Sequence, residues 1–339
     1  MNCIYCNKPN ANSESHIIPE ALGKGPILKS GVCTKCNIQI NNDIEKYIIS
    51  KLSYIRNFLQ ITGKRGNKPN INIEATFSDT TLKISARDPR ELESKFLTFQ
   101  IDEKTGKKKG IVFICPDNEK IEQVKKQYEE RHPNAIWKEI SSDIIEQEIQ
   151  YRIYFDIDNF ADPKCLRLAA KIALEWWCSK RSPQDIAHPN YDEIKYYIRY
   201  GGKTRYPLVS VVSDKKILSY FNKIPFGIHT LFIGTDPRSY NLAVLVGLFS
   251  FVFYKVILNR RYTALAKLEE LATVNPQTGK VYEPRIRASL HEGPCISTIK
   301  ESNNVEPIEV LREMESDLLN RFNKGLENIL TQSRKAHEK

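Results

Sequence analysis

Cys3-Ile4-Tyr5-Cys6 and Cys33-Thr34-Lys35-Cys36 are two Cys-x-x-Cys pairs separated by residues 7–32. Each tight pair can direct two sulfurs to the same side, so two such pairs can place four thiolates tetrahedrally around one Zn²⁺. A redox motif usually occurs as a single pair at a helix start in a βαβ unit. We therefore expect a structural zinc site at Cys3, Cys6, Cys33 and Cys36, with redox chemistry and chance as the weaker alternatives. The lone cysteines suit core positions.

The charge balance of the chain favours an anionic partner. Its 339 residues include 51 Lys and Arg against 41 Asp and Glu, a net charge of +10. A field of this sign attracts nucleic acid first and an anionic membrane surface second.

No membrane span is expected from the sequence. The most apolar run, Leu242–Leu258, is interrupted by Ser250 and Lys255, and it lacks the 18 or so clean apolar residues of a spanning helix. Its composition favours buried strands instead. With no secretory signal visible, we expect a cytoplasmic protein whose thiols stay reduced.

The stretch between the cysteine pairs contains a histidine in an apolar setting. It reads Ser13-Glu14-Ser15-His16-Ile17-Ile18-Pro19-Glu20-Ala21-Leu22-Gly23-Lys24, and Asn37 directly follows the second pair. Apolar residues then recur at helical spacing from about Asn42 to Gln60. The order is thus a cysteine pair, a strand with His16, a turn, a second pair with Asn37, and a helix.

This segment resembles the HNH endonuclease family, in the branch whose ββα-metal fold is held by a four-cysteine zinc site. The resemblance rests on the run "SHIIPEALGK" followed by "CTKCN", and it covers about residues 1–60. It implies that His16 polarises the water that attacks a phosphodiester and that Asn37 braces the hairpin. It also implies a divalent cation, Mg²⁺, Mn²⁺, Ni²⁺ or Zn²⁺, at the scissile phosphate.

The residue before the histidine departs from the family pattern. The family usually has an acidic residue or His there as a metal ligand, whereas this chain has Ser15, with Glu14 one position earlier. Because side chains alternate along a strand, Glu14 and His16 would share a face and Ser15 would point away. Glu14 therefore becomes a candidate metal ligand; a hydroxyl ligand, an irregular strand and a lost catalytic site remain alternatives.

A further metal ligand is expected near the start of the following helix. The candidates are Glu45 and Asp43. Both have another explanation, because Asn42 with Glu45 fits a helix-capping pattern and Asp43 would favour the positive end of the helix dipole. Glu20 is interpreted as a solvated residue.

Basic residues flank this segment and are candidates for phosphate contacts. They are Lys24, Lys35, Lys64, Arg65 and Lys68. The last three lie in a polar, glycine-containing stretch that equally suits a solvated linker.

The remainder of the chain carries no recognisable catalytic motif. Short strand-like runs, a helix opened by Asp162-Pro163 and a C-terminal helix predict a mixed α+β domain. We expect an α+β protein: a zinc-stapled ββα-metal module at 1–62, a basic linker at 63–69, an α+β domain at 70–305 and a C-terminal helix at 306–339. The large domain would select the substrate or sense a signal.

Taken together, these features predict a metal-dependent HNH endonuclease that hydrolyses DNA, with RNA as the second polymer to consider. By analogy of layout, restriction or phage defence is the expected context. The alternatives are an inactive zinc module that binds nucleic acid or a protein, and an activity located in the large domain. The C-terminal helix could support a homodimer.

Overall fold

The structure is a computed structural model of the whole chain. It describes residues 1–63, 66, 68–69, 71–77, 80–86, 96–101, 108–114, 122, 126–127, 129–131, 133, 150–152, 156–236, 241–262, 269–284 and 305–337. These residues belong to two units, one made of Met1–Asn67 with Asp156–Lys339 and the other of Lys68–Phe155.

The N-terminal module of the first unit is a hairpin followed by a broken helix. Strands β1 (Ser13–His16) and β2 (Ile27–Val32) pair antiparallel, with the short helix η1 (Glu20–Leu22) between them. The helical elements that follow are α1 (Thr34–Ile40), the π-helical turn η2 (Asn41–Glu45), α2 (Lys46–Lys51) and α3 (Ser53–Phe58). Buried residues at four-residue spacing, Ile40, Ile44, Ile48 and Leu52, form its apolar face.

The helix starts earlier than the sequence suggested. It begins at Thr34, because Cys33 has the extended backbone of an N-cap, and Asn42 and Glu45 lie within the helical run. The capping pattern expected for Asn42 and Glu45 is therefore wrong. The Asn42 side chain instead accepts a hydrogen bond of 2.7 Å from Lys46.

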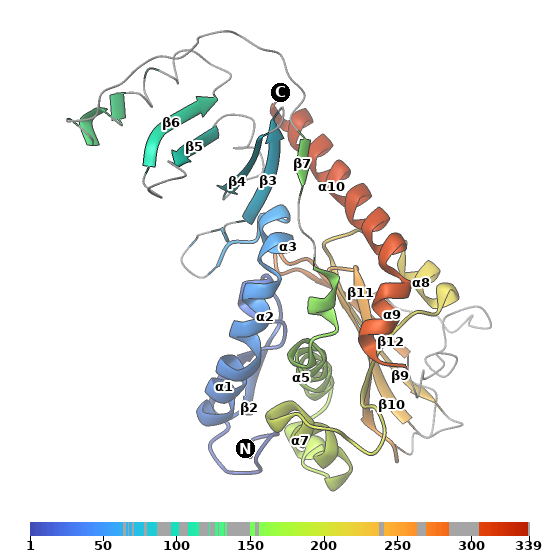
Figure 1. The fold of residues 1–339 in the computed structure, drawn as a ribbon. Helices are drawn as coiled ribbons and strands as arrows, with labels where there is room; N and C mark the ends of the chain where they lie inside the picture. The colour runs from blue at the N-terminus through green and yellow to red at the C-terminus, as the bar shows by residue number, and fades with distance from the viewer. Residues whose placement is uncertain are drawn as a thin grey trace. The chain divides into compact units, whose positions relative to one another are not determined.

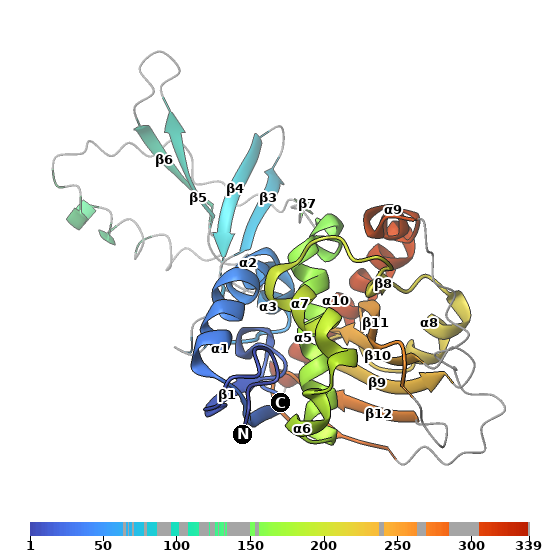
Figure 2. The same ribbon diagram turned by 90° about the horizontal axis from the view of Figure 1, so that it is seen from below.

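Helix α5 (Pro163–Lys180) is the central element of the first unit. The Asp162 side chain accepts from the Lys164 N–H at its start and Pro163 occupies the first turn, where a missing N–H costs nothing. One side of α5 contacts β2, η2 and α2 of the module, and another contacts strands of the sheet described next. Figures 1 and 2 both show α5 between the blue module and the orange sheet.

A six-stranded antiparallel sheet forms the rest of the core. Its order is β13-β12-β9-β10-β11-β8. The strands are β8 (Val209–Val211), β9 (His229–Asp236), β10 (Asn241–Leu248), β11 (Val252–Asn259), β12 (Glu269–Val274) and β13 (Val281–Tyr282). Side chains alternate across it: Phe253 packs with Phe221 of helix α8 (Lys215–Phe221), while Tyr254 faces α5 and reaches Cys165.

Further helices of this unit range in length from a single turn to 23 residues. They are η4 (Ile157–Phe160), α6 (Pro183–Ile186), η5 (Pro189–Tyr191), α7 (Asp192–Tyr200), α9 (Pro307–Glu313) and α10 (Glu315–His337). Phe322 of α10 makes edge-on ring contacts with Phe58 of α3 and Phe226, so the C-terminal helix is tied to the module.

The module is also joined to the sheet around Gly23. This residue has a φ of +133°, and a Cβ there would lie 2.2 Å from the Cβ of Pro276, so only glycine fits. The next N–H, of Lys24, donates to the Pro276 carbonyl at 2.7 Å. Close by in the chain, the Leu22 carbonyl lies 3.2 Å from Nε2 of buried His229 on β9.

The burial of His229 predicts that the contact between the module and the sheet is less stable in acid. The Phe249 N–H donates to Nδ1, so the neutral ring carries its hydrogen on Nε2, and burial lowers the pKa of His229 to about 4. The unfolded chain binds this proton near pH 6.5 and the folded chain near pH 4, so stability falls as the pH drops through that window. We expect a loss of roughly 3 kcal/mol in unfolding free energy, measured by urea unfolding at several pH values.

The control for this prediction is His229→Gln, which removes the titrating group. Its unfolding free energy should fall less between pH 7 and pH 4 than that of the parent, by about the same 3 kcal/mol. Equal losses in both proteins would contradict the assignment, since zinc release and carboxylate protonation affect both alike.

The described residues of the second unit form two small antiparallel groups of strands. Three strands pair in the order β4-β3-β7 and two pair as β5-β6. They are β3 (Ile71–Phe77), β4 (Thr80–Ala86), β5 (Phe96–Ile101), β6 (Lys108–Ile114) and β7 (Gln150–Arg152).

These observations confirm the predicted α+β class with an N-terminal ββα module. The predicted domain ranges stay a prediction, although packing groups the module with 156–339 through α5. Among the residues that the structure describes, no helix is both long and apolar enough to cross a membrane.

Candidate metal centre and histidine site

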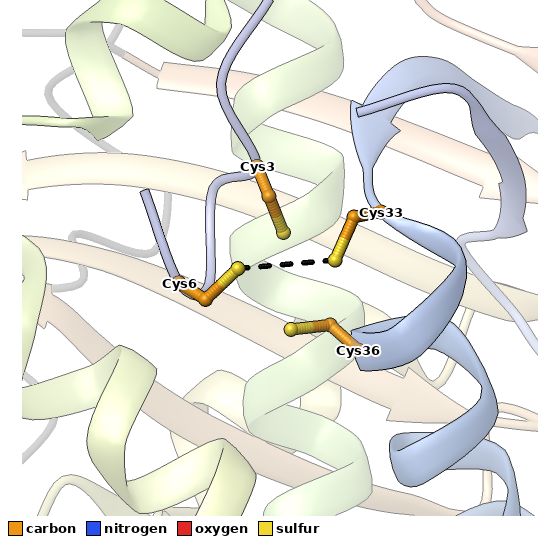
Figure 3. A group of neighbouring side chains, drawn as sticks. All are labelled: Cys3, Cys6, Cys33 and Cys36. Carbon is orange, nitrogen blue, oxygen red and sulfur yellow. Dashed lines mark hydrogen bonds between the residues drawn. The ribbon is translucent and has the colours of Figure 1, made fainter. Parts of the chain in front are cut away.

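The four predicted cysteines come together at one point. Cys3 and Cys6 lie on the N-terminal loop, Cys33 precedes α1, and Cys36 lies in the first turn of that helix (Figure 3). Their sulfurs all lie within 4.8 Å of one another, and those of Cys6 and Cys33 are 3.8 Å apart. A tetrahedral zinc with Zn–S bonds of about 2.3 Å requires sulfurs about 3.8 Å apart. The arrangement fits a structural zinc ion, and all four are free thiols.

The surroundings of the thiols differ. Burial raises the pKa of Cys3 and of Cys36. Burial also acts on Cys33, but hydrogen bonds from the Cys36 backbone and the neighbouring thiols lower its pKa to about 7. A bound Zn²⁺ would supply the positive charge that holds all four as thiolates.

His16 lies at the end of β1 with its ring open to solvent. Its side chain is 37% exposed, and Nε2 lies 3.8 Å from Oε2 of Glu20, which is 41% exposed. Pro19 precedes the short helix η1 and turns the chain so that the two side chains face each other. An accessible imidazole beside a carboxylate can take a proton from water and be stabilised as it becomes charged.

Asn37 ties the helix to the strand that carries His16. Its Nδ2 donates to the Glu14 carbonyl at 3.0 Å, so α1 is linked to β1 two residues before the histidine. This contact is what a bracing role for Asn37 requires.

Ser15 points away from His16 and into the protein. Its side chain is 1% exposed, and its hydroxyl lies 3.0 and 2.9 Å from the two carboxylate oxygens of Glu175 on α5. Ser15 and His16 therefore point in different directions, as expected, and the hydroxyl is already used in the interior. The pairing of β1 with β2 shifts register between Ser13 and Ser15, so the strand is also irregular at Glu14, which was one of the alternatives.

Glu175 belongs to a buried cluster that we call the Lys171 cluster, made of Tyr5, Ser15, Glu45, Lys171 and Glu175. The Lys171 ammonium lies 3.1 Å from a carboxylate oxygen of both Glu45 and Glu175. It also donates to the carbonyls of His16 and Ile17. The Tyr5 hydroxyl donates to Glu175 at 2.9 Å. One lysine of α5 thus holds the backbone at the histidine.

Electrostatics in the Lys171 cluster follow from its burial. Burial raises the pKa of Glu175, and the charge of Lys171 offsets only part of this. Burial alone would lower the pKa of Lys171, but the Glu175 and Glu45 carboxylates raise it overall. Lys171 is therefore a charged, fully paired ammonium.

The acidic residues predicted as metal ligands do not converge. Glu45 is paired with Lys171, whereas Glu14 and Asp43 are exposed. Within the described ranges, the four cysteines are the one set of three or more His, Cys, Asp or Glu side chains placed to hold a metal. The described residues therefore do not form a three-ligand site for a catalytic cation.

Sequence reasoning missed Lys171 and Glu175, and it did not pair Glu20 with His16. The first two are a charged pair at i and i+4 within the apolar stripe of α5, a placement that is costly unless the charges meet partners. This charged pair in an apolar stripe could have indicated a buried polar cluster, but the sequence does not show which residues pair with it. Glu20 was interpreted as solvated, and its position four residues after His16 was the clue.

The predicted phosphate-binding residues are spread over the surface. Lys24 and Lys35 are exposed, and Lys35 lines a hollow beside Cys33 and Cys36 together with Lys8 and Arg199. Lys68 lies in the second unit. Lys64 and Arg65 lie outside the described residues.

Comparison with known proteins bears on the module alone. Residues 3–53 match the family model described as HNH endonuclease. This segment is therefore similar to HNH endonucleases, and we call it the HNH module. No curated protein and no solved structure matches the chain. The HNH module contains the cysteine site, His16 and Asn37. No comparison describes the rest of the chain.

Proposed function

We propose that this protein is an endonuclease that hydrolyses phosphodiester bonds in DNA, with His16 of the HNH module as general base. The observation that carries the proposal is an accessible His16 ring, 3.8 Å from Glu20, on a hairpin braced by Asn37. His16 would take the proton of the attacking water, and Glu20 would stabilise the imidazolium. The net charge of +10 suits a polyanionic substrate.

A divalent cation is part of the proposal because HNH domains generally use one. Since the described acidic side chains do not converge on a ligand set, no step is assigned to the metal, and Glu14, Asp43 and Glu45 stay predictions as its ligands. RNA as substrate, a role in restriction or phage defence, and a homodimer also stay predictions.

A second candidate function is a non-cleaving zinc module that binds nucleic acid or a protein. The observation that favours it is the inward position of Ser15, where the family places a metal ligand, together with the pairing of Glu45 to Lys171. Both side chains serve the interior rather than a surface metal.

The test is a plasmid-cleavage assay with the full chain. Supercoiled DNA is incubated with parent, His16→Ala and Asn37→Ala proteins, with no added divalent cation and with Mg²⁺, Mn²⁺ or Ni²⁺. We expect metal-dependent cleavage by the parent, a loss of about 10²- to 10⁴-fold in His16→Ala, and a smaller loss in Asn37→Ala.

The matched control is His188→Ala, which removes an exposed histidine elsewhere in the same unit and should cleave like the parent. Cleavage that survives in His16→Ala would overturn the assignment of the base. A parent protein that binds DNA but leaves it intact with every cation would favour the non-cleaving module.

A further inference from the structure

Exposed tyrosines gather along α7 and the loop that follows it. Tyr196, Tyr200 and Tyr206 have exposed fractions of 62%, 52% and 52%. The rings of Tyr196 and Tyr200, one helical turn apart, lie with centroids 4.9 Å from each other. Large aromatic side chains are usually buried, so rings gathered in the open suggest a surface that binds a partner.

Cations accompany two of these rings, those of Tyr200 and Tyr206. The guanidinium of Arg199 lies 4.7 Å from the Tyr200 ring centroid, and those of Arg205 and Arg260 lie 5.5 and 5.3 Å from that of Tyr206. Lys203 and Arg261 are also exposed nearby in the chain.

Acidic charge around the tyrosines is limited. On α7, Asp192 is paired with Lys195 at 2.9 Å, which leaves Glu193 as the acidic residue on the exposed side of that helix. The cations near the rings outnumber it, so the charge of this face suits an anionic polymer.

Two hollows lie near opposite ends of α7. One hollow is lined by Glu193, Arg205, Tyr206, Arg260 and Arg261, among others. From Glu193, residues three and seven positions further along α7 are Tyr196 and Tyr200, so all three share one side of the helix.

The end of α7 meets the HNH module. Arg199 lines the hollow beside Cys33 and Cys36 with Lys8 and Lys35. It also donates to the Tyr5 carbonyl at 3.4 Å, within the first cysteine loop. The Gln39 side chain of α1 donates to the Arg199 carbonyl, so the exposed tyrosines of α7 lie on a helix that packs against the module.

We propose that this tyrosine-arginine surface, made of Tyr196, Arg199, Tyr200, Lys203, Arg205, Tyr206, Arg260 and Arg261, binds an unpaired nucleic-acid strand beside the HNH module. Bases would stack on the tyrosine rings, and the arginines and Lys203 would contact phosphates. Stacking requires unpaired bases, because a duplex hides their faces. The choice of nucleic acid as the ligand rests on the proposed function. The inference adds a site that binds the strand outside the HNH module.

The test measures binding separately from cleavage. Full-length protein carrying His16→Ala is titrated against a fluorescent oligothymidine strand, without added divalent cations, and binding is followed by anisotropy. In this background, Tyr196→Ala/Tyr200→Ala/Tyr206→Ala should bind at least about 10-fold more weakly, since stacking on each aromatic ring is worth about 5- to 150-fold. The control is Tyr282→Ala, which removes a tyrosine that is 68% exposed on β13 and should bind like the background protein.

Charge substitutions test the phosphate contacts. Arg205→Gln/Arg261→Gln should lower the slope of log affinity against log salt by about 1.4, because each contact to a single strand contributes about 0.7. The control is Lys215→Gln/Lys216→Gln, which removes two exposed cations of α8 and should leave the slope unchanged. Circular dichroism must show the same fold in every variant.

Three results would overturn the inference. The first is that the triple tyrosine variant binds the strand within about twofold of the background protein. The second is that its affinity for a duplex probe falls by as much as its affinity for the single strand. The third is that polyglutamate displaces the strand as readily as unlabelled strand does. If strand binding depends on the tyrosines but the parent protein, with His16 intact, never cuts DNA, the binding surface is supported and the nuclease function is refuted. If the parent cuts DNA and the tyrosine substitutions leave cleavage unchanged, the nuclease function is supported and the binding surface is refuted.

Discussion

Replacing Cys36 with serine is expected to unfold the HNH module while the sheet of the first unit keeps its structure. The N-terminal loop meets the hairpin and α1 at the cysteine site, where sulfurs of both segments approach within 4.8 Å. Structural zinc contributes on the order of 10 kcal/mol to such modules, and burial of Cys36 leaves little room for a water to replace the sulfur. The β8–β13 sheet has its own core around Phe221, Phe232 and Phe253.

Zinc content and hydrogen exchange measure this effect. We expect one zinc per parent chain, less than one in Cys36→Ser, and loss of amide protection over residues 3–53 with protection retained in β9–β11. The control is Cys178→Ala, which removes a cysteine that is 1% exposed on α5 and should keep both zinc and protection. Full protection of the module in metal-free Cys36→Ser would show that packing on α5 suffices without the metal.

Local patterns predicted the HNH module well because its chemistry depends on short spacings. Four cysteines in two pairs could meet only if the chain between them folded back, and the hairpin of β1 and β2 does this. Alternation along β1 placed Ser15 opposite His16. The run from Leu242 to Leu258 also behaves as predicted, as the paired strands β10 and β11.

What the sequence could not supply was the partner of each buried polar group. Ser15 is bonded to Glu175, 160 residues away, and Lys171 reaches the His16 carbonyl across 155 residues. A pattern of period two or 3.6 shows which face of an element is buried, but it does not identify the element that covers it. The role of Glu45 was unresolved for the same reason, because its ligand-like position faces α5.

Replacing Lys171 with methionine is expected to lower the unfolding free energy by about 3–5 kcal/mol, because it leaves a buried carboxylate without its counter-charge. Glu175 is 0% exposed and keeps only the hydroxyls of Tyr5 and Ser15 as partners. The matched control on the same helix is Lys180→Met, whose ion pair with Glu283 is partly exposed and should contribute less than about 1 kcal/mol. Chemical denaturation of the full chain measures both.

A double variant then separates stability from the positioning of His16. In Lys171→Met/Glu175→Gln the charge of fully buried Glu175 is gone, and the partly exposed Glu45 carboxylate alone still lacks its partner. The amide oxygen can still accept from Tyr5 and Ser15, so at least about 1 kcal/mol should return relative to Lys171→Met. The Lys171 donors to the His16 and Ile17 carbonyls are still missing. DNA cleavage should therefore stay at least about 10-fold below the parent, because the turn that aims the imidazole is released. Cleavage that recovers together with stability would show that Lys171 supports the fold alone, whereas cleavage that stays low in a restabilised protein makes the α5 lysine a positioning residue of the HNH module.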